Sequence, residues 1–213
     1  MPTTVLLIRH PESAWNAAGI YQGQMDIPLS PLGCIQAELV ATHLSGEQIT
    51  GITSSPLRRA HSLAQAVGRH HSVAVLTDPR LTEIGHGSWE GLPRHDVRTR
   101  FPSQYQRWLD QPHDVSFEGG ESLAEVHARS VPVVSALLQR SGDETWVVVT
   151  HDTVCRLVVA ASRRKPVTGF LEVALENAGI TTLVGPELAG SVTRVNEVDH
   201  LGEHRVDLEL QAL

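Results

Sequence analysis

The first residues in this chain that could carry out chemistry are an arginine and a histidine at the end of a short apolar run. Arg9 and His10 directly follow residues 5–8, and Pro11 ends the run. In open α/β sheets, side chains that leave the carboxyl end of a central strand face a crevice where ligands bind. An isolated Arg-His pair could equally be a strand end that carries two polar residues, because short motifs often occur by chance. The interpretation therefore depends on partners elsewhere in the chain.

Three further side chains occupy comparable positions. Arg59, Glu83 and His151 each lie at or just beyond the end of a predicted strand. An arginine fork binds two phosphate oxygens at once, a histidine can accept a phosphoryl group, and a carboxyl group can move a proton. If the five side chains converge, they contain the parts for phosphoryl transfer through a covalent histidine.

The elements that must position these residues alternate along the chain. Strands are predicted for four apolar runs, at residues 5–8, 49–53, 73–76 and 146–150. The spacing of apolar residues predicts helices over residues 31–44, from Pro56 onward, over 122–139, and after Thr153. Such alternation implies a mostly parallel sheet covered on both faces, with the functional loops gathered at one edge.

Two segments depart from the alternation. Residues 85–120 contain glycines, prolines and most of the aromatic residues, which favours a cap-like insertion of short helices and loops over the site. Residues 180–184 and 192–198, separated by a Gly-Pro turn, predict a β-hairpin that closes the edge of the sheet. We therefore expect an α/β fold, a three-layer α/β/α sandwich, with residues 1–213 forming a single domain.

Composition narrows the class of protein. A hydrophobic fraction of 41% and a charged fraction of 19% are typical of a globular protein. The net charge of −7 argues against a nucleic-acid partner, so any bound anion must be held by a local cluster of arginines. Cys34 and Cys155 form no Cys-x-x-Cys pair. The amino-terminal apolar run is too short for a signal peptide or a membrane span, so we expect a cytoplasmic protein without a membrane partner.

Six segments carry motifs in a recognisable order: residues 9–16 (Arg-His-Pro-Glu-Ser-Ala-Trp-Asn), 22–30, 54–60, 81–83, 119–122 and 149–151. Their order resembles that of the histidine phosphatase superfamily, which contains the cofactor-dependent phosphoglycerate mutases and their phosphatase relatives. One match would be weak evidence, but the six together follow the family's order over nearly the whole chain.

The resemblance implies a role for each matched residue. His10 would be the nucleophile that forms a phosphohistidine, and Glu83 would protonate the leaving alcohol and then activate water. The equatorial phosphate oxygens would be held by Arg9, Arg59, Asn16 and a protonated His151. Gln22, Gly23, Asp152 and Thr153 would complete the substrate-binding site. No metal or other cofactor is implied, because the arginines supply the positive charge.

Two positions differ from the family's usual pattern. Pro11 replaces a glycine, which removes a backbone N–H beside the phosphate, although its carbonyl could still orient the His10 ring. Asp152 replaces a residue that is often glycine. It could be a helix N-cap, or it could be a proton donor that competes with Glu83. We expect the remaining histidines, His86 among them, to be mostly surface or cap residues.

The favoured hypothesis is a metal-independent phosphatase that hydrolyses a small-molecule phosphomonoester. The alternatives are a cofactor-dependent phosphoglycerate mutase and a non-catalytic phosphate-binding regulatory module. The residues do not identify the ester. The edge of the hairpin could pair with a second copy of the chain, which would give a homodimer.

Overall fold

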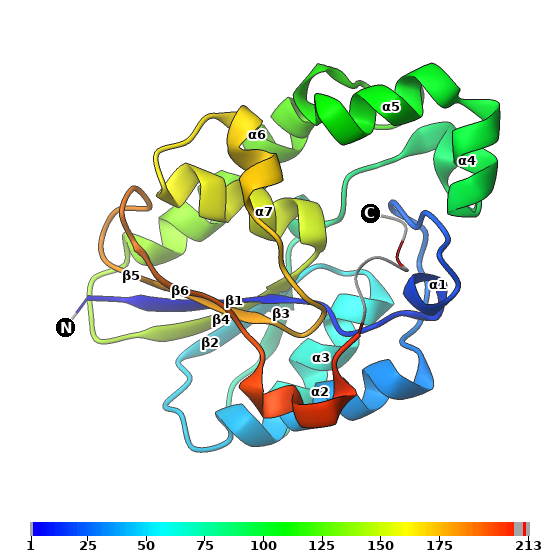
Figure 1. Ribbon diagram of the computed structural model, residues 1–213. Coiled ribbons are helices and arrows are strands. Elements are labelled where there is room, and N and C mark those ends of the chain that lie inside the picture. Colours follow the sequence, from blue (N-terminus) through cyan, green and yellow to red (C-terminus); the bar gives the residue numbers. More distant parts are fainter. Residues whose placement is uncertain (1, 207–210, 212–213) are drawn as a thin grey trace.

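The computed structural model describes residues 2–206 and residue 211, and in these residues six strands form one sheet of order β3-β2-β4-β1-β5-β6 (Figure 1). The strands are β1 (Thr4–Arg9), β2 (Gly51–Ser54), β3 (Val75–Thr77), β4 (Thr145–Thr150), β5 (Ile180–Val184) and β6 (Val192–Glu197). β1, β4, β2 and β3 are parallel, and β5 runs antiparallel to both β1 and β6. The predicted mostly parallel sheet with a closing hairpin is confirmed.

Helices cover both faces of the sheet. α2 (Pro31–Leu44) and α3 (Arg58–Gly68) lie on one face, and α6 (Leu123–Leu138) and α7 (Asp152–Ser162) lie on the other (Figure 1). Successive side chains of a strand point to opposite faces, so Leu6 and Ile8 pack with α2 and α3 while Val5 and Leu7 pack with α6 and α7. This confirms the three-layer α/β/α sandwich.

Serine caps define where two of these helices begin. The Ser30 hydroxyl accepts from the Gly33 N–H at the start of α2, and Ser122 forms a capping box with Glu125 at the start of α6. The predicted start of α3 was wrong by two residues. α3 begins at Arg58 rather than at Pro56, and Leu57 is at the N-cap position, because the Ser55 hydroxyl accepts from the Leu57 N–H and contacts His151 Nε2 instead of capping the helix.

The predicted insertion consists of short helices joined by loops. They are η2 (Gly87–Trp89), α4 (Arg94–Arg100), α5 (Pro102–Asp110) and η3 (Pro112–Asp114). α4 and α5 lie beyond the sheet on the side of α6 and α7 (Figure 1). Trp89 is fully buried and contacts Tyr21 and Phe117 edge to face, so an aromatic cluster holds the insertion to the rest of the protein.

The remaining elements are short: α1 (Ala14–Ala17), η1 (Pro79–Leu81), η4 (Val167–Glu172) and η5 (Asp199–His204). Within the described part of the chain, no helix combines the length and the apolar character needed to cross a bilayer.

Candidate active site

The two histidines are brought together by the pairing of two neighbouring strands. Arg9 and Thr150 are partners in the parallel register of β1 and β4, so the next residues, His10 and His151, leave the sheet side by side. The His10 N–H donates to the Thr150 carbonyl at 2.8 Å, and the centroids of the two rings are 5.1 Å apart.

A small pocket opens at this edge of the sheet. Its empty volume is about 410 Å³, part of which is open to solvent. Nine of the ten predicted site residues line it: Arg9, His10, Asn16, Gln22, Gly23, Arg59, Glu83, Asp152 and Thr153. The tenth, His151, lies against the His10 ring. The sequence did not predict the three other lining residues, His86, Trp108 and Phe170.

The hydrogen bonding of His10 defines its tautomer. Its Nδ1 lies 2.6 Å from the Pro11 carbonyl oxygen, which can only accept, so Nδ1 carries the proton and Nε2 keeps its lone pair. Burial lowers the pKa of His10 well below its usual value, and the charges of Arg59 and Arg9 lower it further. The ring is therefore neutral. The carbonyl of Pro11 orients the ring, as expected for this departure from the family pattern.

Arg59 reaches the pocket from the first turn of α3. Its Nη1 and Nη2 donate to the carbonyls of Met25 and Gly23, each at 2.8 Å, and its Nε has no partner among the described residues. Burial lowers its pKa to about 10, with Glu83 as the largest opposing influence, so the guanidinium stays charged at neutral pH. Gly23 has a φ of +51°, and a Cβ there would overlap the Glu90 carboxylate, so only glycine fits.

Arg9 is held by a buried polar network. Its Nη1 donates to the Leu175 carbonyl at 2.6 Å and lies 3.3 Å from Asp152 Oδ1. The Oε1 of Gln211 accepts from Arg9 Nη2 at 2.8 Å and from Asn16 Nδ2 at 3.2 Å. A carboxamide oxygen thus occupies the point where the two donors meet. No sequence motif pointed to Gln211.

Asn16 and Gln22 are connected through a helix cap. Ser13 begins α1, and its N–H and hydroxyl both contact Asn16 Oδ1. The same hydroxyl lies 2.6 Å from Gln22 Oε1. Because these oxygens are engaged, the amide NH₂ groups of Asn16 and Gln22 are the ends left to meet an anion.

Glu83 has the electrostatics of a proton donor. Its carboxylate accepts from the Ile84 N–H at 2.8 Å and lies 3.5 Å from the Thr153 N–H. Burial raises the pKa of Glu83, and the nearby charge of Asp152 raises it further. A carboxyl group in this environment keeps its proton at a higher pH than an exposed glutamate does.

The N-cap interpretation of Asp152 was wrong. His151 occupies the N-cap position of α7, and Asp152 is the first residue of the helix. Its two oxygens instead pair with Arg9 at 3.3 Å and with Arg156 at 3.2 Å. The carboxylate therefore orients Arg9.

The surroundings of His151 favour a neutral ring, whereas the resemblance implies a protonated His151 on the bound phosphate. Burial lowers its pKa well below the usual value, and the charge of Arg59 lowers it further. Its Nε2 lies 2.8 Å from the Ser55 hydroxyl, and its Nδ1 has no partner among the described residues. A neutral ring follows, because a buried cation would be surrounded by arginines.

His86 is not a surface residue; it occupies the N-cap position of η2, but its side chain makes no capping hydrogen bond. His86 is buried against the rings of Tyr21, Trp108 and Phe117, and neither ring nitrogen has a partner among the described residues. Burial is the main cause that lowers the pKa of His86 to about 3, and the positive charge of Arg59 also lowers it. The sequence offered one sign that His86 is a pocket residue: it lies three residues after Glu83, at the start of the aromatic segment.

The described residues contain no group of three or more His, Cys, Asp or Glu side chains that could hold a metal ion. The positive charge that the structure places around the pocket comes from Arg9 and Arg59.

Comparison with known proteins gives consistent matches over most of the chain. Phosphoserine phosphatase 1 of Hydrogenobacter thermophilus is 35% identical over 203 residues, covering 95% of this chain and 96% of that protein. Glucosyl-3-phosphoglycerate phosphatase of Mycobacterium tuberculosis is 32% identical over 200 residues, covering 88% and 87%.

Solved structures agree with these relatives. A mycobacterial glucosyl-3-phosphoglycerate phosphatase superposes with a TM-score of 0.81 at 30% identity, covering 92% of this chain and 98% of that one. Phosphoserine phosphatase from Entamoeba histolytica gives a TM-score of 0.81 at 29% identity, covering 93% and 99%. Residues 5–198 match the family described as histidine phosphatase superfamily (branch 1), a span that includes both histidines, Arg59 and Glu83. This chain therefore belongs to branch 1 of the histidine phosphatase superfamily.

Proposed function

We propose that this protein hydrolyses a small-molecule phosphomonoester through a phosphohistidine formed on His10 Nε2, without a metal ion. The observation that carries the proposal is the tautomer of His10. Its Nδ1–H is donated to the Pro11 carbonyl, and the nitrogen that keeps its lone pair belongs to a residue lining a pocket with two arginines. A neutral imidazole in such a place is a nucleophile.

The first half-reaction transfers the phosphoryl group to the protein. The His10 Nε2 lone pair forms a bond to phosphorus while the bond from phosphorus to the ester oxygen breaks. Glu83, whose pKa is raised by burial, gives its proton to the departing oxygen. Arg9, Arg59 and Asn16 hold the equatorial oxygens, and each fixed donor of this kind commonly contributes about 100-fold or more in rate.

The second half-reaction uses the same residues in reverse. The ionised Glu83 takes a proton from water, the water oxygen bonds to phosphorus, and the bond to His10 breaks. Inorganic phosphate then leaves and Glu83 is protonated again.

A bound phosphate dianion changes the state of two other groups. It favours a protonated His151, because an opposite charge then lies within hydrogen-bonding range. It also displaces the Gln211 oxygen from Arg9 and Asn16. Gln22, Gly23 and Thr153 complete the phosphate site, and Asp152 acts through Arg9.

In this proposal the leaving group lies against His86, Trp108 and Phe170, which line the same pocket as Glu83 and were not predicted from the sequence. The ring nitrogens of His86 have no partner among the described residues and can form hydrogen bonds with a polar leaving group. We propose phosphoserine as the first candidate substrate. It is small and polar, and a relative of nearly equal length, 35% identical, is named as a phosphoserine phosphatase.

A panel of esters tests the function. Phosphoserine, p-nitrophenyl phosphate, glucosyl-3-phosphoglycerate and 3-phosphoglycerate would be incubated in chelator with the protein and with His10→Ala. We expect phosphate release that His10→Ala abolishes. Isomerisation of 3-phosphoglycerate that needs a bisphosphoglycerate primer would instead support the mutase. Phosphate binding without either activity would support the regulatory module.

The same proposal covers the organisation of the protein. We propose that residues 1–213 form one domain in which residues 85–120 cap the site, supported by the contribution of His86 and Trp108 to the pocket. We propose a cytoplasmic location, which the free thiols of Cys34 and Cys155 support. The homodimer stays a prediction, and light scattering on the purified protein tests it.

A further inference from the structure

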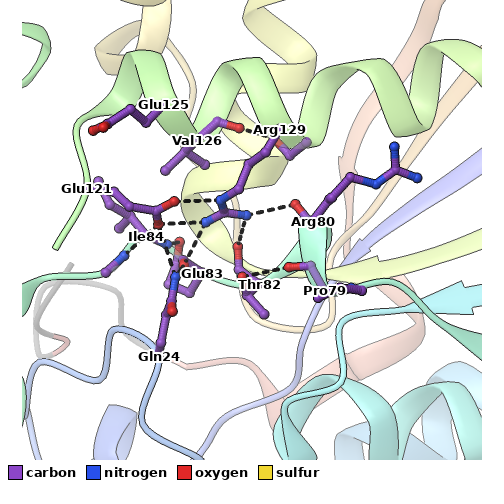
Figure 2. A network of polar contacts seen from close by, with 12 residues as sticks. Gln24, Pro79, Arg80, Thr82, Glu83, Ile84, Glu121, Glu125, Val126 and Arg129 are labelled. Carbon is purple, nitrogen blue, oxygen red and sulfur yellow. Dashed lines mark hydrogen bonds and ion pairs between the residues drawn. The ribbon is translucent and has the colours of Figure 1, made fainter.

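Arg129 lies on α6 and is absent from the residues that line the pocket, yet three of its five N–H donors bind the segment that carries Glu83 and the other two bind Glu121 (Figure 2). Its Nη1 donates to the carbonyls of Arg80 at 2.7 Å and Thr82 at 2.8 Å. Its Nη2 donates to the Glu83 carbonyl at 2.9 Å. The two remaining donors bind the Glu121 carboxylate, at 2.7 Å from Nε and 2.8 Å from Nη2.

Glu121 extends the network to two further loops. Its Oε2 accepts from the Gly85 N–H at 3.0 Å and from Gln24 Nε2 at 3.1 Å. Burial alone would raise the pKa of Glu121, but the hydrogen bonds from Arg129 and Gly85 bring it below its usual value. The carboxylate is therefore ionised at neutral pH. Its pair with Arg129 has two N–H···O bonds, the strongest geometry for such a pair.

The backbone of Glu83 is clamped from two sides. Its carbonyl accepts from Arg129 and also from Gln24 Nε2 at 3.1 Å (Figure 2). Gln24 follows Gly23, whose carbonyl accepts from Arg59. The network thus connects the segment with the proposed proton donor to the loop that holds a phosphate-binding arginine.

Close backbone packing supports the same arrangement. The Glu121 N–H donates to the Gly85 carbonyl at 2.8 Å, and a Cβ on Gly120 would lie 2.2 Å from that oxygen. Glycine at position 120 therefore allows Glu121 to approach the donor segment closely enough to share Arg129 with it.

We propose that Arg129 and Glu121 are positioning residues for the proton donor, an inference that rests on the phosphatase function proposed above. One guanidinium binds three carbonyls, those of Arg80, Thr82 and Glu83, and thereby places the Glu83 carboxyl group beside the leaving oxygen. Neither side chain lines the pocket, so they act through Glu83 and not on the substrate.

Leaving-group dependence distinguishes positioning from general structural damage. p-Nitrophenyl phosphate releases a weak base that needs little protonation, whereas phosphoserine releases an alkoxide that needs a full proton. For Arg129→Met we expect formation of the phosphoenzyme from phosphoserine to fall by about 10- to 100-fold, part of what general acid catalysis contributes. Formation from p-nitrophenyl phosphate should change by less than about threefold, because it makes little use of that acid.

The second half-reaction gives an independent readout. Glu83 must also activate water, so the phosphoenzyme of Arg129→Met should accumulate. We expect a burst of p-nitrophenolate followed by slow turnover. In a Glu83→Gln background, Arg129→Met should cause little further loss, because both changes remove the same function.

Three variants serve as controls. Arg129→Lys keeps the charge but cannot reach three carbonyls and a carboxylate at once, so it should behave like Arg129→Met. Glu121→Gln, which still accepts from Gly85, should show the same substrate dependence more weakly. Arg69→Met removes an exposed arginine that pairs with Glu38 on the other face of the sheet and should leave both substrates unaffected. Melting temperatures identify any variant that fails to fold.

The outcomes separate the two proposals. Equal losses on both esters, or full activity of Arg129→Lys, would overturn the positioning role while leaving the phosphatase in place. Wild-type protein that released no phosphate from any ester would overturn both.

Discussion

The rings of His10 and His151 lie 5.1 Å apart at the ends of adjacent parallel strands, and burial lowers the pKa of both, which favours neutral rings. The proximity follows from the register that pairs Arg9 with Thr150. The neutrality follows from burial beside Arg59. In the proposed mechanism His10 is the nucleophile and His151 gains a proton when the phosphate dianion binds.

The assignment of the proton donor predicts different effects for two neighbouring carboxylates. Glu83→Gln should lower phosphoenzyme formation from phosphoserine by about 100-fold or more, because it removes the acid. The wild-type rate should fall as pH rises through the raised pKa of Glu83, because the acid loses its proton. The Glu83→Gln variant should not show this decrease at alkaline pH. Single-turnover rates across pH measure both.

Asp152→Asn is the matched control for Glu83→Gln. It should weaken phosphate binding, because Asp152 orients Arg9. It should keep the decrease in rate at alkaline pH, shifted to lower pH because the charge of Asp152 raises the pKa of Glu83. If only the Asp152 change slows departure of the leaving group, the donor is Asp152 and our assignment is wrong.

His86 should affect substrates with polar leaving groups most. His86→Phe keeps a ring of similar size among Tyr21, Trp108 and Phe117 but removes both nitrogens. We expect kcat/KM for phosphoserine to fall by about 10-fold, the value of one lost hydrogen bond in a buried site, with p-nitrophenyl phosphate nearly unaffected. Steady-state kinetics on both esters tests this, and equal effects would remove His86 from leaving-group recognition.

The buried histidines predict loss of stability in acid. His86 has a folded pKa of about 3, below the usual 6.5, so the unfolded chain binds a proton before the folded protein does. The free energy of unfolding is therefore unaffected by these groups above about pH 6.5 and decreases as pH falls toward 3. Each such histidine lowers it by at most about 1.4 kcal/mol per pH unit.

Urea unfolding between pH 7 and 4 measures this loss. The free energy of unfolding of His86→Phe should depend less steeply on pH than that of the wild type. An unchanged slope would show that His86 does not contribute to the acid loss.

Gln211 should compete with phosphate. Its Oε1 accepts from Arg9 and Asn16, so Gln211→Ala frees two donors that an anion needs. We expect competitive inhibition by inorganic phosphate to become about fivefold tighter, which corresponds to roughly 1 kcal/mol for one exchanged hydrogen bond. Weaker inhibition would mean that Gln211 holds Arg9 in place and does not compete with the ligand.

Much of the fold could be predicted from local patterns. The alternation of apolar runs and helical spacings indicated the order of strands and helices, because each pattern depends on residues close in the chain. The positions of Arg9, His10 and His151 at strand ends followed from the same patterns. The start of α3 was missed because Ser55 makes loop contacts instead of capping the helix.

The sequence by itself predicted nine of the twelve residues that line the pocket and placed Arg9, His10 and His151 at the ends of strands. Only the tertiary structure decided their states and their supports. The neutral His151, the pairing of Asp152 with two arginines, the burial of His86 and the clamp of Arg129 on the Glu83 segment all depend on residues distant in the chain. Charge states and positioning depend on burial and on such partners, and no local pattern encodes either.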